Sequence, residues 1–321
     1  MYKVALSAFA AVALLACGVA RAADDEPWKD QSTALVIDAY ELNIIEWDKL
    51  VANKRIAGFI SKASDGLPEV YDCRKPHRGD TAAHCKTMWR KYAVSRELYQ
   101  TRRMLAKAKG MLWGAYHLAR PGNPVDQANH FLDYAEPADD EMMVLDLEGL
   151  DRSEYMSLDD AEIFAAHIKA RTGRYPVLYT NHVTAQHIAA RRQDHPLLSR
   201  LPLWYARYKP DIKGVFPMGN WDNYLLWQFS SASNCGARSC PMRIEGTLRD
   251  IDINTVPMSA EALAAIWAQG QLLPVRAPEF QHLVIASVSL GTSTLASAPA
   301  EARAWIGRRQ TEITALNYQD F

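Results

Sequence analysis

The stretch MMVLDLEGLD, residues 142–151, places two carboxylates, Asp146 and Glu148, at the end of a strongly apolar run. Alternation along a strand puts these two positions on the same face, roughly 6.5–7 Å apart along the chain. Two acids at that spacing in a partly dry site do not ionise independently, and one is driven toward its protonated form. The stretch therefore predicts a buried strand that ends in an acid pair suited to acid catalysis.

Similar apolar runs recur along the chain and alternate with helical patterns through most of its length. The strand candidates cover residues 34–40, 57–64, 111–119, 142–147, 175–180, 201–206, 223–229 and 248–254. This order predicts an α/β fold, an irregular TIM-like (β/α) barrel with eight mostly parallel strands and with helices missing after the later strands. A doubly wound open sheet is the alternative, although DAYELN (38–43) lacks the Gly-rich phosphate turn expected after its first strand.

The length of the chain limits the number of domains, and its net charge limits the classes of ligand it can bind. The chain has 321 residues and a formal net charge of −1, so it fits one large barrel or two average domains. The near-zero charge gives no electrostatic basis for binding nucleic acid. No cofactor or metal motif is present, and we expect a monomer that uses neither a cofactor nor a metal.

The N-terminal residues 1–27 have the features of an export signal. Lys3 supplies the positive region, residues 4–16 form an apolar run too short to span a bilayer, and Ala20 to Ala22 form an A-x-A cleavage site. We expect a signal peptide over residues 1–22, no membrane span, and a location in the periplasm or outside the cell. The alternative is a lipoprotein box, LLAC, with a lipid anchor at Cys17.

Export to an oxidising compartment would allow the cysteines to form disulfides. Four remain beyond the signal: Cys73, Cys85, Cys235 and Cys240. An even number in an oxidising compartment predicts disulfides, and proximity suggests Cys73–Cys85 and Cys235–Cys240, although three pairings are open. A zinc site fits less well, because the chain offers neither a CxxC pair nor histidines at finger-like spacing.

The chemistry of a parallel barrel lies at the C-terminal ends of its strands. In this chain those ends carry polar or aromatic residues: Asp38, Tyr116, His117, Asp146, Glu148, Tyr179, Asn181, Trp204 to Tyr208, Gln228 and Asp252. We interpret His117 as a hydrogen-bonding residue, since no partner ligands for a metal occur at suitable spacing.

Eight motifs resemble, in order and spacing, glycoside hydrolase family 25, the Chalaropsis-type lysozymes (N-acetylmuramidases). They are VIDAYELN (36–43), GFISKASDG (58–66), GAYHLARP (114–121), VLDLE (144–148), YPVLYTN (175–181), LWYARY (203–208), LLWQF (225–229) and DIDIN (250–254). The resemblance covers about residues 33–257 and implies a lysozyme that cleaves the β-1,4 bond between N-acetylmuramic acid and N-acetylglucosamine in peptidoglycan.

The resemblance implies roles for the matching residues. Glu148 would be the general acid, Asp146 and Asp38 would flank the catalytic subsite, and the sugar groove would be lined by Tyr116, Tyr179, Trp204, Tyr208, Gln228 and Asp252. The chain departs from the family pattern at Tyr40 and Glu41, which replace a small residue and a frequent His, and at Asp65, where Glu is usual.

Three chemical routes are open to such a pair. A carboxylate nucleophile needs acids about 5–5.5 Å apart and an inverting enzyme roughly 6.5–9.5 Å. The third route uses the substrate's own 2-acetamido group, positioned by Asp146, while the negative Asp146 raises the pKa of Glu148. We expect this third route, with net retention. A chitinase-like glycosidase and a non-catalytic glycan-binding barrel are the rival functions.

The domain organisation follows from these patterns. We expect the catalytic barrel over residues 30–257 and a C-terminal extension of unknown role over residues 258–321, which starts with a closing helix in SAEALAAIWAQG (259–270).

Overall fold

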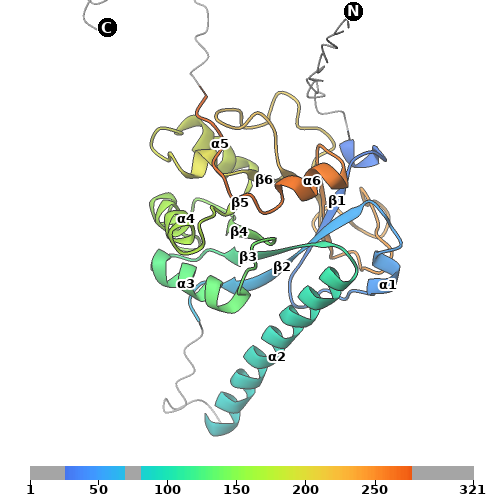
Figure 1. Ribbon diagram of the computed structural model, residues 1–321, viewed down its shortest axis with the longest axis vertical. Coiled ribbons are helices and arrows are strands. Elements are labelled where there is room, and N and C mark those ends of the chain that lie inside the picture. Colours follow the sequence, from blue (N-terminus) through green and yellow to red (C-terminus); the bar gives the residue numbers. More distant parts are fainter. Residues whose placement is uncertain (1–25, 69–80, 277–321) are drawn as a thin grey trace, which may run out of the picture. The chain divides into compact units, whose positions relative to one another are not determined.

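The computed structural model describes residues 26–68 and 81–276, and in them eight strands close into a barrel in sequence order (Figure 1). The strands are β1 (Leu35–Ala39), β2 (Ile56–Asp65), β3 (Leu112–Leu118), β4 (Met142–Leu147), β5 (Val177–Asn181), β6 (Leu203–Ala206), β7 (Leu226–Ser230) and β8 (Asp252–Thr255). The predicted TIM-like barrel is confirmed, and the open doubly wound sheet is excluded because β8 pairs with β1.

The last strand runs against the others. Strands β1 to β7 are parallel to one another, whereas β8 is antiparallel to both of its neighbours, β1 and β7. As a result the first residue of β8, Asp252, pairs with Asp38 near the C-terminal end of β1. The reversed direction therefore brings Asp252 to the end of the barrel where the other strands finish.

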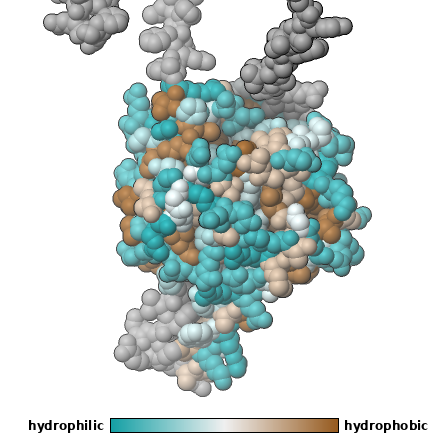
Figure 2. Space-filling view, viewed as in Figure 1, coloured by the Kyte–Doolittle hydropathy of each residue, from teal (hydrophilic) through white to brown (hydrophobic). Residues whose placement is uncertain are grey.

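Helices cover the outside of the early strands. They are α1 (Trp47–Leu50), α2 (Thr81–Ala108), α3 (Pro124–Ala135), α4 (Leu158–Thr172), α5 (His182–Ala190) and α6 (Ala260–Ile266), with 3-10 turns η1 (Pro27–Lys29) and η2 (Leu198–Arg200). Helix α2 runs out beyond the barrel in Figure 1. In the view of Figure 2, hydrophilic and hydrophobic residues are interspersed over this covering layer.

Local sequence explains the helix ends. The Ser157 hydroxyl accepts from the Asp160 amide at 3.1 Å, and α4 ends at Gly173 with φ of 76°. Pro124 begins α3, as its missing amide hydrogen allows. Within residues 26–68 and 81–276 no α-helix separates β6, β7 and β8 from one another, so the prediction of missing late helices is confirmed.

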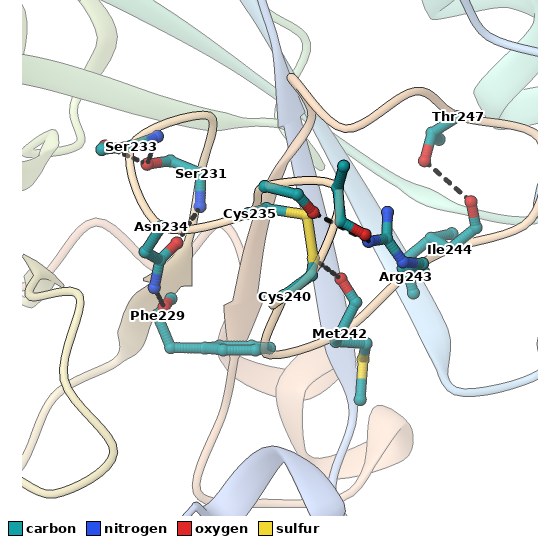
Figure 3. The surroundings of a disulfide bond; sticks show 12 residues. Phe229, Ser231, Ser233, Asn234, Cys235, Cys240, Met242, Arg243, Ile244 and Thr247 are labelled. Carbon is teal, nitrogen blue, oxygen red and sulfur yellow. Dashed lines mark hydrogen bonds between the residues drawn. A yellow bond between two sulfur atoms is a disulfide. The ribbon is translucent and has the colours of Figure 1, made fainter.

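A loop takes the place of the helix between β7 and β8, and a disulfide joins Cys235 to Cys240 in it (Figure 3). The Asn234 side chain accepts from the Ser231 amide and donates to the Phe229 carbonyl, which ties this loop to the end of β7. The predicted Cys235–Cys240 pairing is confirmed. Cys73 lies outside the described residues, so the Cys73–Cys85 pairing stays a prediction.

The barrel is filled from the end opposite the acids. Its interior holds Val36, Ile60, Met142, Val144, Val177, Leu226 and Trp267, among others. The Trp267 indole donates to the Trp113 carbonyl at 2.7 Å. A Cβ on Gly58 would lie 3.0 Å from the Trp267 ring, so the glycine permits this close approach.

The segment after β8 belongs to the same compact unit, which ends at Arg276. Residues 258–276, the first part of the expected extension, pack with the barrel through α6 and Trp267. The expected signal peptide and the remainder of the extension, 277–321, lie outside the described residues. Among the residues that the structure describes, no helix is both long and apolar enough to cross a bilayer.

Candidate active site

Four carboxylates gather where the strands of the barrel finish. Asp38 lies in β1, Asp146 in β4, Glu148 just after β4, and Asp252 at the start of β8. Burial raises the pKa of Tyr116 on β3 well above its usual value, and the charges of Asp146, Asp38 and Asp252 raise it further. Tyr116 therefore lies among these acids, and the structure brings together the carboxylates that the sequence singled out.

Asp38 is held by two side-chain amides. The Asn254 Nδ2 donates to its Oδ2 at 2.7 Å, and the Gln228 Nε2 donates to both carboxylate oxygens at 3.2 and 3.3 Å. Burial raises the pKa of Asp38 to about 6, while the hydrogen bonds from Asn254 and Gln228 oppose the rise. Because both amides present donors, they favour the ionised form of Asp38.

The orientation of each amide is set by a donor on its other side. The Trp204 indole donates to the Asn254 Oδ1 at 2.5 Å. The hydroxyls of Tyr179 and Tyr208 donate to the Gln228 Oε1 at 2.8 and 2.7 Å. An indole can only donate, so it fixes the oxygen of Asn254 toward itself and the amino group toward Asp38.

Asp252 has the opposite environment. Burial raises its pKa to about 9, and the charges of Asp38, Asp250 and Glu148 add to the rise. Near neutral pH Asp252 is therefore protonated, while its neighbour Asp38 is ionised.

Asp146 is 6% exposed, and its Oδ1 has no hydrogen-bond partner among the described residues. Burial raises its pKa well above the usual value, and the charges of Glu148 and Asp38 raise it further. A buried oxygen without a partner carries an unmet acceptor, which a ligand's donor can satisfy.

Glu148 is the exposed member of the pair. Partial desolvation of its carboxyl raises its pKa, Arg120 lowers it, Asp65 raises it and Lys62 lowers it. From the sequence we expected the charge of Asp146 to raise the pKa of Glu148. The structure instead puts the larger rise on Asp146, because Asp146 is the more deeply buried of the two.

Charges alternate along the mouth beside Glu148. Lys62 lies 3.9 Å from Glu41 and 3.3 Å from Asp65. Arg120 pairs with Asp65 through two bonds of 2.6 and 3.1 Å. Asp65, which stands where the family pattern has Glu, thus holds Arg120 in place. Of the neighbouring cations, Arg120 lowers the pKa of Glu148 most.

The expected groove residues separate into two groups. Tyr116, Tyr179, Tyr208 and Asp252 are partly exposed at the mouth. Trp204 and Gln228 are each only 1% exposed, so they orient other side chains and do not line a groove. Alternation along a strand shows which residues face inward but not how deeply each one is buried. The two groups therefore could not be told apart from the sequence.

Asn254 was missed by the sequence analysis, although it is fully buried and contacts Asp38 directly. It lies two residues after Asp252, on the same face of a strand, and that spacing is the signal that could have revealed it.

His117 points into the helical layer. It bonds to the Ser64 hydroxyl at 2.8 Å and to the Gln127 Oε1 at 3.0 Å, and it stacks on Phe164. Burial lowers its pKa to about 4, so it is neutral. The interpretation of His117 as a hydrogen-bonding residue is confirmed. In the part of the chain that the structure describes, no group of histidine, cysteine and acidic residues could hold a metal.

Comparisons with known proteins concern the family and the fold. Residues 91–237 match the model of the family Glycosyl hydrolases family 25, a segment that includes β3 to β7 with Asp146 and Glu148. A bacterial lysozyme from Streptomyces coelicolor has a similar fold, with TM-score 0.51, 22% identity, and coverage of 75% of this chain and 100% of that chain.

Two fungal structures are also similar. A muramidase from Acremonium alcalophilum has TM-score 0.49 and 19% identity, covering 73% of this chain and 99% of that chain. A family GH25 lysozyme from Aspergillus fumigatus has TM-score 0.49 and 19% identity, covering 74% and 99%. A search of curated proteins found no match.

Proposed function

We propose that this chain, whose residues 91–237 match the model of glycoside hydrolase family 25, is an exported lysozyme of that family that cleaves the β-1,4 bond between N-acetylmuramic acid and N-acetylglucosamine in peptidoglycan. The observation that carries the proposal is the pairing at the end of β4. An exposed acid, Glu148, follows a buried acid, Asp146, whose Oδ1 has no partner among the described residues.

Glu148 is the general acid. Its exposed position lets it reach the oxygen of a glycosidic bond, and its raised pKa lets it hold a proton closer to neutral pH than an ordinary glutamic acid. It donates this proton to the leaving oxygen as the bond from that oxygen to the anomeric carbon breaks.

Asp146 positions the substrate's 2-acetamido group. In the free site the buried Asp146 favours the protonated form. An acetamido N–H that donates to the unpartnered Oδ1 favours ionised Asp146, so the proton shared by the two acids moves toward Glu148. Substrate binding thereby favours the protonated form of the general acid, Glu148.

The ionised Asp146 accepts the acetamido N–H and so increases the electron density on the acetamido carbonyl oxygen. This oxygen attacks the anomeric carbon as the leaving group departs. Glu148, now ionised, removes a proton from water, and the hydroxide opens the cyclic intermediate from the opposite side. Two inversions give net retention.

Asp38 and Asp252 complete the floor of the site. Ionised Asp38, fixed by Asn254 and Gln228, provides a negative charge that stabilises positive charge developing at the anomeric carbon. Protonated Asp252 avoids a second negative charge beside it and can donate to a sugar hydroxyl. Asymmetric protonation thus gives the two acids different roles.

The test is the release of soluble muropeptides from purified peptidoglycan by the chain without residues 1–22, with products reduced by borohydride and identified by mass spectrometry. We expect reduced muramic acid ends from the wild type. Glu148→Gln should lower the rate about 10²–10⁴-fold. Glu154→Gln, an exposed acid on the same loop between β4 and α4, is the matched control and should act as wild type.

Other outcomes contradict the proposal in distinct ways. Reduced glucosamine ends would mean that the bond is wrong, and cleavage of chitin oligomers without action on peptidoglycan would favour the chitinase-like reading. Binding without release by wild type and Glu148→Gln alike would favour a glycan-binding barrel. An α-anomer as first product, detected by NMR, would rule out net retention.

A further inference from the structure

Tyr40 follows β1 as Glu148 follows β4, each being the first residue after its strand. Glu148 follows the buried Asp146 by two residues, and Tyr40 follows the buried Asp38 by two residues. Alternation directs both pairs to one face, so Tyr40 lies one step further out than Asp38. In the closed order of eight strands, β1 and β4 are separated by β2 and β3 on one side and by four strands on the other. Tyr40 and Glu148 therefore follow strands that are not neighbours and lie at different places around the mouth.

The backbone of Tyr40 is firmly held. Arg102, 4% exposed on α2, donates to the carbonyls of Tyr40 at 2.8 Å and Asn43 at 2.5 Å. The Asn43 Oδ1 accepts from the Tyr40 amide at 2.8 Å, and its Nδ2 donates to the Asp250 carbonyl at 3.1 Å. The loop after β1 is thus joined to α2 on one side and to the loop before β8 on the other.

The ring of Tyr40 is free by contrast. It is 37% exposed, and its side chain makes no hydrogen bond or ring contact within the described residues. The neighbouring acid, Glu41, faces Lys62 at 3.9 Å. A ring that is unoccupied and stands on a firmly held backbone can bind a ligand with only its own side-chain torsions to order.

We propose that Tyr40 is an aromatic platform for a saccharide unit, at a place on the rim of the mouth separate from that of Glu148. The inference rests on the proposed function, whose glycan strand offers pyranose rings with apolar C–H faces and polar edges. The ring covers such a face, while the carboxylates below it take the hydroxyl and amide groups. The ligand class is a linear chain of N-acetylated hexosamines.

The experiment compares Tyr40→Ala and Tyr40→Phe with Leu42→Ala in steady-state hydrolysis of soluble glycan strands. Leu42 is 72% exposed on the same loop and serves as the matched control. Tyr40→Ala should raise KM about tenfold with kcat within about twofold, because the platform binds substrate and transition state alike. Tyr40→Phe, which keeps the ring, and Leu42→Ala should match the wild type.

An unchanged KM in Tyr40→Ala, or an equal rise in Leu42→Ala, would overturn the inference. Binding separates its failure from that of the proposed function. If the wild type hydrolyses nothing, co-sedimentation with insoluble peptidoglycan still tests Tyr40, since Tyr40→Ala should bind more weakly than the wild type and Tyr40→Phe equally well. Equal sedimentation of all three would also overturn it.

Discussion

The indole nitrogen of Trp204 lies 2.5 Å from the Oδ1 of Asn254, whose amide nitrogen lies 2.7 Å from the Oδ2 of Asp38. A fully buried aromatic on β6 thereby determines which atoms of a β8 amide face a carboxylate on β1. The donor-only chemistry of the indole is the physical cause.

Trp204→Phe tests this orientation. The variant keeps an aromatic ring but removes the indole donor, so the amide of Asn254 can rotate and Asp38 loses a fixed hydrogen bond. We expect kcat to fall about tenfold with KM nearly unchanged, and the free energy of unfolding to fall by about 1–3 kcal/mol.

The matched control is Trp28→Phe, because Trp28 is also buried and its indole nitrogen has no partner among the described residues. Steady-state kinetics and denaturant unfolding measure both variants. A rise in KM alone in Trp204→Phe would show that the residue contacts the sugar after all.

Asn254→Ala should change the pH dependence of activity. The hydrogen bond from Asn254 lowers the pKa of Asp38, which burial has raised to about 6. Removing the donor raises this pKa further, so Asp38 ionises only at higher pH. We expect the acid limb of the kcat/KM profile to move up by about one pH unit, since a hydrogen bond to a charge is worth about 1.5–3 kcal/mol.

Asn220→Ala is a suitable comparison, because Asn220 is buried but bonds to Ser199, away from the carboxylates. Its profile should overlay that of the wild type. An acid limb that moves to lower pH in Asn254→Ala would contradict the assigned role of the amide.

Asp252→Asn should stabilise the protein at high pH. Burial raises the pKa of Asp252 from 3.8 to about 9, so the folded state binds a proton that the unfolded state has lost between these values. Stability from this group is therefore lost as the pH rises through that window. The amide removes the penalty, and we expect a Tm higher by a few degrees at pH 8 but unchanged at pH 3.

Calorimetry at both pH values checks this expectation, and the variant should keep most of its activity, because the Asn amide can donate to a sugar as protonated Asp252 does. A Tm gain of equal size at pH 3 and pH 8 would mean that the effect does not arise from ionisation.

The Cys235–Cys240 disulfide should contribute modestly to stability. It closes a short loop, with a sequence separation of 5, so the loop-closure entropy removed from the unfolded chain is worth about 2 kcal/mol. The double change Cys235→Ser and Cys240→Ser should lower the free energy of unfolding by that amount and leave kcat within about twofold. Denaturant titration with and without reductant measures it. A large loss of activity would instead place the loop in the groove.

Much of the fold could be predicted from local pattern. The apolar runs around Asp38 and Asp146 are encoded by neighbours in sequence, so these strands were expected close to where they occur. Helix α2 begins at Thr81 among polar residues that carry no apolar periodicity, so local pattern does not mark its start. The reversed direction of β8 also leaves no mark in its short sequence.

The sequence by itself determined the strand order and the acids that meet at the mouth. Side-chain alternation and residue type are local properties, and they sufficed for Asp146 and Glu148. Only the tertiary structure decided the depth of each residue, and with it which carboxyl carries the proton. Burial and hydrogen-bond partners from distant strands, as with Trp204 and Asn254 around Asp38, set those energies, and neither exists until the barrel closes.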